Sequence, residues 1–138
     1  MERLVIEATK ENLPYLTQCI DEKLEAADCP IKIQMQIDVA VEEIFINIAS
    51  YAYEGQNKTG EAEILFDISE ESNTFTITFV DSGIPYDPLA KEDPDVTLSA
   101  AERQIGGLGI FMVKKSMDDV RYEYKDGKNR LTLTKHLG

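Results

Sequence analysis

Apolar residues recur at a helical spacing in the first third of the chain and at alternate positions further on. A short apolar run at residues 4–6 predicts an edge strand. Leucine and isoleucine then recur every three or four residues from 13 to 24. This spacing predicts a helix that Thr9 and Asn12 can cap and that ends at residues 28–30. A second, longer helix is predicted from about residue 33 to 53, with Gly55 as its C-terminal cap.

Alternating apolar residues further along predict two antiparallel hairpins with one helix between them. Strands are expected at 64–68, 75–79, 119–124 and 130–135, the helix at 108–117, and the last turn at 126–128. Residues 83–107 lose this periodicity, and a loop of that length in a small domain is usually functional. A short helical piece is expected inside it, around residues 98–103.

The expected order of elements, β-α-α-β-β-loop-α-β-β, is typical of an α+β fold. We expect a two-layer α/β sandwich with a mixed, mostly antiparallel sheet, covered on one face by about three helices. The length of 138 residues suits a single domain spanning residues 1–138.

Charge and composition exclude several classes of function. Acidic residues outnumber basic ones 26 to 14, and the resulting net charge of −12 would repel nucleic acids and anionic membranes. His136 is the only histidine, and Cys19 and Cys29 stand ten residues apart, so a Cys/His zinc site and a Ser-His-Asp triad are poorly supported. The N-terminal residues lack the pattern of a signal peptide, which predicts a cytoplasmic protein.

A carboxylate and a carboxamide stand four residues apart in the long second helix. Glu43 and Asn47 would point the same way, roughly opposite the main apolar stripe, and two oxygen ligands so placed suit Mg²⁺ or its bound water. Glu42 is the neighbouring alternative. An ordinary solvated helix face remains an open interpretation of the pair.

Two further segments carry candidate chemistry. Asp81 ends a predicted strand, where it can accept a hydrogen bond from an exocyclic amine, and Gly83 allows backbone to approach a flat ligand closely. An ordinary Asp-Ser-Gly turn is the alternative. A glycine cluster at residues 106–109 opens the third helix, whose first N–H groups and dipole can hold phosphate. A flexible hinge is the alternative there.

The three segments together resemble the GHKL ATP-binding superfamily, whose fold is the Bergerat sandwich. Glu43-x-x-x-Asn47 is similar to its N box, residues 81–88 to its G1 box, and residues 106–110 to its G2 box. The match is closest to the stand-alone anti-sigma factor and serine-protein kinase branch, the RsbW/SpoIIAB-like group. One position departs from many members, because Ser50 stands where they have histidine.

The resemblance implies a role for each motif residue. Glu43 would be the general base, Asn47 would bind Mg²⁺, and Asp81 would contact the adenine amine, with Gly83 beside the base. The residues implied to contact the ATP phosphates are Arg103, Gly106, Gly107, Leu108 and Gly109. Residues 84–105 or so would form the ATP lid of a histidine-kinase-like ATPase domain.

The resemblance also implies an activity and partners. The chain would be an anti-sigma regulatory factor that transfers the γ-phosphate of ATP to a serine of a STAS-domain anti-anti-sigma protein. It would hold a sigma factor in a partner-switching pathway and form a homodimer, for which the apolar edge at residues 4–6 is a candidate interface. The alternative is a nucleotide-gated binding switch with little kinase turnover. An adaptor with a dead pocket is disfavoured because Glu43 and Asn47 are retained.

Overall fold

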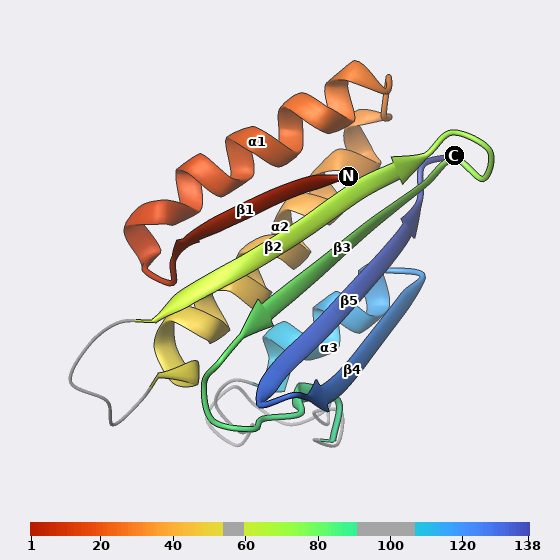
Figure 1. Ribbon diagram of the computed structural model, residues 1–138. Coiled ribbons are helices and arrows are strands. Elements are labelled where there is room, and N and C mark those ends of the chain that lie inside the picture. The colour runs from red at the N-terminus through yellow and green to blue at the C-terminus, as the bar shows by residue number, and fades with distance from the viewer. Residues whose placement is uncertain (54–59, 91–106) are drawn as a thin grey trace.

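Five strands in the described part of the chain form one sheet, and the helices lie against one of its faces (Figure 1). The computed structural model describes residues 1–53, 60–90 and 107–138. The strands are β1 (Glu2–Glu7), β2 (Glu61–Ser69), β3 (Thr74–Asp81), β4 (Asp119–Lys125) and β5 (Lys128–His136). Their order in the sheet is β1-β2-β3-β5-β4, so β1 lies at an edge, as predicted. The α+β sandwich is confirmed, and the pairing between the described strands is antiparallel throughout where a mixed sheet was expected.

Among the described residues, three α-helices cover the sheet, at positions close to the predicted ones. They are α1 (Leu13–Ala26), α2 (Ile31–Asn47) and α3 (Gly107–Ser116), and the short helical turns are η1 (Lys10–Asn12), η2 (Ile48–Ala52) and η3 (Pro88–Ala90). The helix predicted from about residue 33 to 53 is an α-helix as far as Asn47 and continues as the π-helical turn η2 to Ala52. The proposed cap at Gly55 and the helical piece around 98–103 lie outside the described residues.

The predicted side-chain caps of α1 do not form. Asn12 occupies the N-cap position of α1 and Thr9 that of η1, but neither side chain makes a capping hydrogen bond. The Asn12 amide nitrogen instead donates to the Glu7 carbonyl at 2.9 Å. Asn12 therefore ties the start of the helical region to the end of β1.

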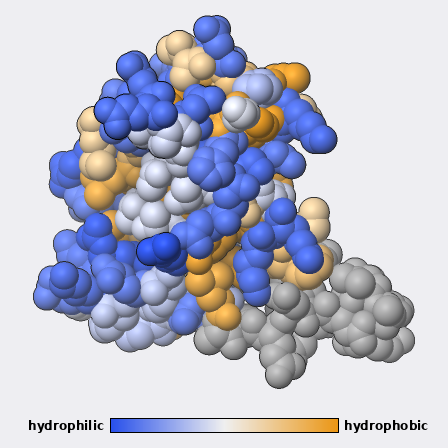
Figure 2. Space-filling view, turned by 90° about the vertical axis from the view of Figure 1, so that its right-hand side faces the viewer, coloured by the Kyte–Doolittle hydropathy of each residue, from blue (hydrophilic) through white to orange (hydrophobic). Residues whose placement is uncertain are grey.

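The core lies between the inner face of the sheet and the apolar stripes of the helices. The register of β2 and β3 pairs Ile64 with Phe79 and Phe66 with Ile77, all of them buried. Leu133 continues this face on β5. Each such side chain contributes about 1.5–3 kcal/mol through removal from water. Seen from the side of β4 and β5, the surface is mostly hydrophilic, in keeping with the exposed polar side chains of β4 (Figure 2).

A two-residue turn sets the position of β5. Asp126 and Gly127 both have positive φ, at 55° and 75°, which is typical of a type I′ hairpin turn. The turn predicted at residues 126–128 is thereby confirmed. It places Asn129 opposite Tyr124 on β4 and opposite Asp81 on β3.

Two carboxyl groups meet where α1 packs on α2. The Oδ1 atoms of Asp21 and Asp38 are buried and accept no hydrogen bond within the described part of the chain. Burial, together with the neighbouring carboxylates of Asp21 and Glu25, raises the pKa of Asp38 to about 8. Asp38 is therefore largely protonated at neutral pH in the folded chain.

Among the described helices, none combines the length and the hydrophobicity that crossing a membrane requires.

Candidate functional site

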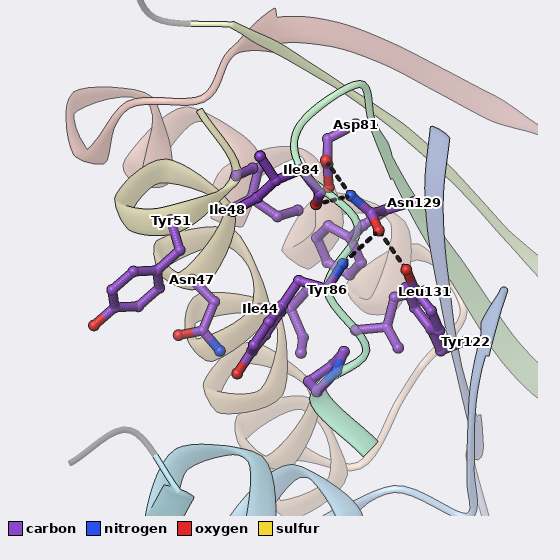
Figure 3. A pocket seen from close by; sticks show the side chains of 13 residues that line it. Ile44, Asn47, Ile48, Tyr51, Asp81, Ile84, Tyr86, Tyr122, Asn129 and Leu131 are labelled. Carbon is purple, nitrogen blue, oxygen red and sulfur yellow. Dashed lines mark hydrogen bonds between the residues drawn. The ribbon is translucent and has the colours of Figure 1, made fainter. Parts of the chain in front are cut away.

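A cavity of about 270 Å³ opens where the end of α2, the end of β3 and the start of β5 meet (Figure 3). Most of its wall is apolar or aromatic, and the polar groups are few. Its lining residues are Ile44, Asn47, Ile48, Tyr51, Ala52, Phe79, Asp81, Ile84, Tyr86, Pro88, Tyr122, Asn129 and Leu131. An apolar slot with a few fixed polar groups is the usual form of a small-molecule site.

Asp81 supplies the carboxylate of this cavity. It ends β3 and is 7% exposed. Its Oδ1 accepts hydrogen bonds from the Gly83 N–H at 2.9 Å and from the Asn129 amide nitrogen at 2.9 Å. Its Oδ2 has no hydrogen-bond partner among the described residues. The cavity therefore holds one carboxylate oxygen able to accept a hydrogen bond from a ligand.

The loop after β3 is docked on the π-helical turn η2. The Ile84 N–H donates to the Ala52 carbonyl at 2.9 Å, and a Cβ placed on Gly83 would collide with that carbonyl group. We expected Gly83 to allow backbone to approach a ligand. The close approach within the described residues is to Ala52 of the same chain, and the approach to a ligand stays a prediction.

Tyr53 also holds the start of this loop in place, through hydrogen bonds of its hydroxyl group. Its hydroxyl accepts a hydrogen bond from the Ser82 N–H at 3.0 Å and donates to the Glu61 carbonyl at 2.5 Å. Burial raises the pKa of Tyr53, so the hydroxyl keeps its proton. The end of β3 is thus held on two sides.

Asn47 and Glu43 lie one turn apart on α2 and face different neighbours. Asn47 lines the cavity beside Ile44 and Ile48. We predicted that the pair would lie opposite the apolar stripe of this helix, and for Asn47 this is wrong because Ile44 and Ile48, which belong to that stripe, line the same cavity. The Glu43 carboxylate lies against α3, where a Cβ on Gly109 would overlap its Oε2.

Glu42, the alternative to Glu43, points elsewhere. It is exposed and lines an outer groove together with α1 residues such as Asp21 and Glu25. The geometry therefore favours Glu43 as the carboxylate that belongs with the third motif.

The glycine cluster meets the second helix at the start of α3. This helix begins at Gly107, as the sequence predicts to within one residue. Its first N–H groups have no partner within the helix, and the helix dipole adds positive potential there. Gly106 and Arg103 lie outside the described residues, as does the predicted lid beyond residue 90. Leu108 is within α3.

The fold thus brings the three predicted segments together. Asp81 and Asn47 share the cavity, and Glu43 stands one helical turn from Asn47, in contact with the first turn of α3. A turn of helix advances about 5.4 Å, so a ligand with a flat base and an attached phosphate chain can span these groups.

Residues from β4 and β5 that the sequence analysis did not propose also line the cavity. They are Tyr122, Asn129 and Leu131, with Tyr86 from the loop. Asn129 alternates with Leu131 and Leu133, so it is a polar side chain on an otherwise apolar strand face. That break in the pattern is the signal that would have revealed it.

The donor set suits a magnesium ion that arrives with phosphates. Within the described ranges no group of three or more His, Cys, Asp or Glu side chains is arranged to hold a metal. Mg²⁺ in nucleotide sites is typically held by one or two protein oxygens, with phosphates and waters completing its shell. The Asn47 amide oxygen, one turn from the Glu43 carboxylate, fits that requirement.

Comparison with known proteins gives one family and a consistent set of relatives. Residues 6–135 match the model described as the histidine kinase-like ATPase domain, a range that includes all three motif segments. The chain is 27% identical over 105 residues to the serine/threonine-protein kinase BtrW of Bordetella bronchiseptica, covering 76% of this chain and 72% of that protein. It is 29% identical to the serine-protein kinase RsbW of Listeria monocytogenes, where the match covers 73% of this chain and 64% of that protein.

Two solved structures share the fold. The RsbU and RsbW domains of Rv1364c from Mycobacterium tuberculosis match with a TM-score of 0.68 at 16% identity, over 99% of this chain and 33% of that one. The catalytic domain of histidine kinase ThkA matches with a TM-score of 0.52 at 13% identity, over 99% of this chain and 98% of that one. The family model and the kinase relatives confirm the predicted resemblance to this superfamily and to its serine-protein kinase branch, and the two solved structures agree with it in fold.

Proposed function

The chain belongs to the family of histidine kinase-like ATPase domains, and on that premise we propose that it is an ATP-dependent serine-protein kinase of the anti-sigma type. ATP would bind in the cavity, and its γ-phosphate would pass to a serine of a STAS-domain anti-anti-sigma protein. The observation that carries this proposal is the pairing of Asp81 and Asn47 in one cavity, a single helical turn from the contact between Glu43 and Gly109.

Adenine recognition would depend on Asp81. The free Oδ2 would accept a hydrogen bond from the exocyclic amine, while the apolar walls, including Ile48 and Leu131, would cover the two faces of the base. Burying a flat aromatic ring in such a slot is favourable because both faces leave water. A carboxylate that only accepts hydrogen bonds would also disfavour a base with a carbonyl at the same position.

The phosphates would extend toward the start of α3. The N–H groups of Gly107, Leu108 and Gly109 would face them, with Gly106 and Arg103 nearby in sequence. Mg²⁺, when bound through Asn47, would offset the charge of the phosphate oxygens. This local arrangement is needed because the net charge of −12 provides no general attraction for an anion.

Glu43 would act as the general base. It would accept the proton of the serine hydroxyl as the serine oxygen bonds to the γ-phosphorus and the bond from that phosphorus to the bridging oxygen breaks, releasing ADP. Support comes from the names of the relatives, which are serine or serine/threonine kinases. As part of the same proposal, the chain would act in the cytoplasm and hold a sigma factor in a partner-switching pathway, as its resemblance to the RsbW/SpoIIAB-like group implies.

Homodimer formation through β1 is part of the proposal. β1 is an edge strand, and Val5 at its centre is 44% exposed. Unpaired backbone groups and an exposed apolar side chain are what a second strand needs for pairing.

Calorimetric titration with ATP, with and without Mg²⁺, tests the binding step. We expect Mg²⁺-dependent binding to the unmodified protein and its loss in Asp81→Asn, since the amide would present a donor where an acceptor is needed. No binding to the unmodified protein would overturn the proposal.

A transfer assay tests the chemistry. ATP labelled at the γ-phosphate is incubated with the chain and with STAS-domain proteins of the same genome, and labelled acceptor is measured. Glu43→Gln is expected to bind ATP and to transfer label only at a small residual rate, while the neighbouring exposed Glu42→Gln, the matched control, transfers normally. Full transfer by Glu43→Gln would refute the assigned base. Binding without transfer in the unmodified protein would favour the nucleotide-gated switch.

A further inference from the structure

Asn129 is a buried polar side chain at the first inward position of β5. It is 6% exposed, and the sheet register places it directly opposite Asp81. A buried amide is costly unless each of its polar atoms is hydrogen-bonded. The partners of Asn129 therefore indicate why a polar residue interrupts this apolar face.

The amide of Asn129 makes four hydrogen bonds, which connect three separate segments (Figure 3). Its Nδ2 donates to Asp81 Oδ1 at 2.9 Å and to the Ile84 carbonyl at 2.8 Å. Its Oδ1 accepts from the Tyr86 N–H at 3.1 Å and from the Tyr122 hydroxyl. Two donors and two lone pairs are the full capacity of an amide.

These partners leave the amide a single orientation. Exchanging its oxygen and nitrogen would set the oxygen against the two acceptors, Asp81 Oδ1 and the Ile84 carbonyl. It would also set the nitrogen against the Tyr86 N–H. Asn129 is thus a fixed donor toward Asp81, held by backbone on one side and by Tyr122 on the other.

The fixed donor determines which oxygen of Asp81 is available. Oδ1 already accepts from Asn129 and from the Gly83 N–H, whereas Oδ2 has no partner in the described part of the chain. Rotation of the carboxylate would break both bonds to Oδ1. The orientation of Asp81 in the cavity is therefore set from β5 as well as from its own loop.

We infer that Asn129 is a positioning residue that holds the Asp81 carboxylate with Oδ2 free and thereby sets the preference of the cavity for a purine bearing a 6-amino group. The inference rests on the proposed function, because it takes adenine as the ligand of Asp81. Asn129 would not contact the 6-amino group of adenine itself; it would orient Asp81, which accepts the hydrogen bond from that group.

A purely structural role for Asn129 predicts a different result. If the amide only stabilised the loop, its loss would lower the binding affinity of every nucleotide by the same factor. If it positions Asp81, its loss weakens ATP more than an analogue without the amine. The ratio of the two affinities therefore separates the roles.

The experiment compares ATP with purine riboside 5′-triphosphate, which lacks only the amine, by calorimetry in the presence of Mg²⁺. A hydrogen bond to a charged group typically contributes enough for a 10- to 100-fold preference, and we expect the unmodified protein to favour ATP by about that factor. In Asn129→Asp the acceptor side of the amide is kept, but the donor toward Asp81 becomes a repelling oxygen. We expect the preference to fall to about threefold or less at pH 8.

Asn129→Ser serves as the second variant should the aspartate variant fail to fold, because the short hydroxyl cannot reach all four partners. Thr132→Val is the matched control. It removes the Thr78–Thr132 hydrogen bond between the same two strands, at 3.0 Å, on the outer face of the sheet. We expect it to keep the full preference for ATP.

The outcomes distinguish this inference from the proposed function. If folded Asn129 variants bind both nucleotides more weakly by the same factor, the positioning role is overturned, while the proposed function as an ATP-binding protein stands. Equal binding of the two nucleotides by the unmodified protein also overturns it. Failure of the unmodified protein to bind ATP overturns the proposed function and this inference with it.

Discussion

Gly109→Ala is expected to disable phosphoryl transfer while leaving nucleotide binding nearly intact. A Cβ at Gly109 would overlap Glu43 Oε2 and lie 2.9 Å from Glu43 Cδ. Non-bonded carbon atoms settle about 3.5–4.0 Å apart, so the carboxyl carbon must move by about 0.6–1 Å. Glu43 can make this move because the overlapped atoms are the far end of a flexible side chain.

The expected magnitudes follow from that displacement. A new side-chain rotamer costs about 0.5–1.5 kcal/mol, so the free energy of unfolding falls little. Misplacing a catalytic group by about 1 Å can lower a rate about 100-fold, equivalent to about 2.7 kcal/mol in the activation free energy. The alanine keeps its backbone N–H, so we expect the ATP affinity to change by less than about threefold.

Single-turnover transfer of labelled γ-phosphate to the STAS acceptor measures this effect, with calorimetry for the affinity and urea unfolding for the stability. The control repeats the substitution in the Glu43→Gln background. There it should lower the residual rate by less than about threefold, because the carboxylate is already absent. A folded Gly109→Ala that transfers phosphate at the normal rate would refute the reasoning, and so would equal losses in the two backgrounds.

Two further predictions concern stability. Since burial and Asp21 raise the pKa of Asp38 from 3.8 in the unfolded chain to about 8, stability falls as the pH rises between those values. Asp38→Asn should therefore be more stable than the unmodified protein by about 1–2 kcal/mol at pH 8, a value kept small because part of the carboxylate reaches water. Urea unfolding should show this gain at pH 8 and none near pH 4. Equal stability of the two proteins at pH 8 would contradict this. Gly83→Ala drives a Cβ into the Ala52 carbonyl, a backbone group that cannot yield, and should lose about 2–3 kcal/mol, whereas exposed Ser82→Ala should stay within about 0.5 kcal/mol of the unmodified protein.

The regular elements of this protein could be predicted from sequence because their periods are local. The alternation on β2 and β3 and the helical spacing on α1 each depend on residues only a few positions apart. The last turn was equally accessible, since an Asp-Gly pair tolerates the positive φ that a type I′ turn requires. The two-layer arrangement then follows from the need of each apolar face to be covered.

Sequence periodicity did not predict the local backbone conformation where contacts with distant residues determine it. The helical spacing predicts one helix to about residue 53 and does not show that its end forms the π-helical turn η2. The Ala52 carbonyl in that turn accepts the hydrogen bond of the Ile84 N–H from the loop after β3. The Asn12 side chain has the chemistry of a cap and instead bonds to Glu7. In both cases the competing partner comes from outside the helix, where periodicity carries no information.

By itself, the sequence determined which residue types could serve a nucleotide site, namely Glu43, Asn47, Asp81 and the glycines that open α3. Only the tertiary structure decided that Asn47 faces the cavity, that Glu43 rather than Glu42 meets α3, and that Asn129 orients Asp81. The reason is physical. Residue chemistry and periodicity can be recognised within a short stretch of chain. A hydrogen bond between β3 and β5, in contrast, depends on a sheet register that forms only when distant segments pack together.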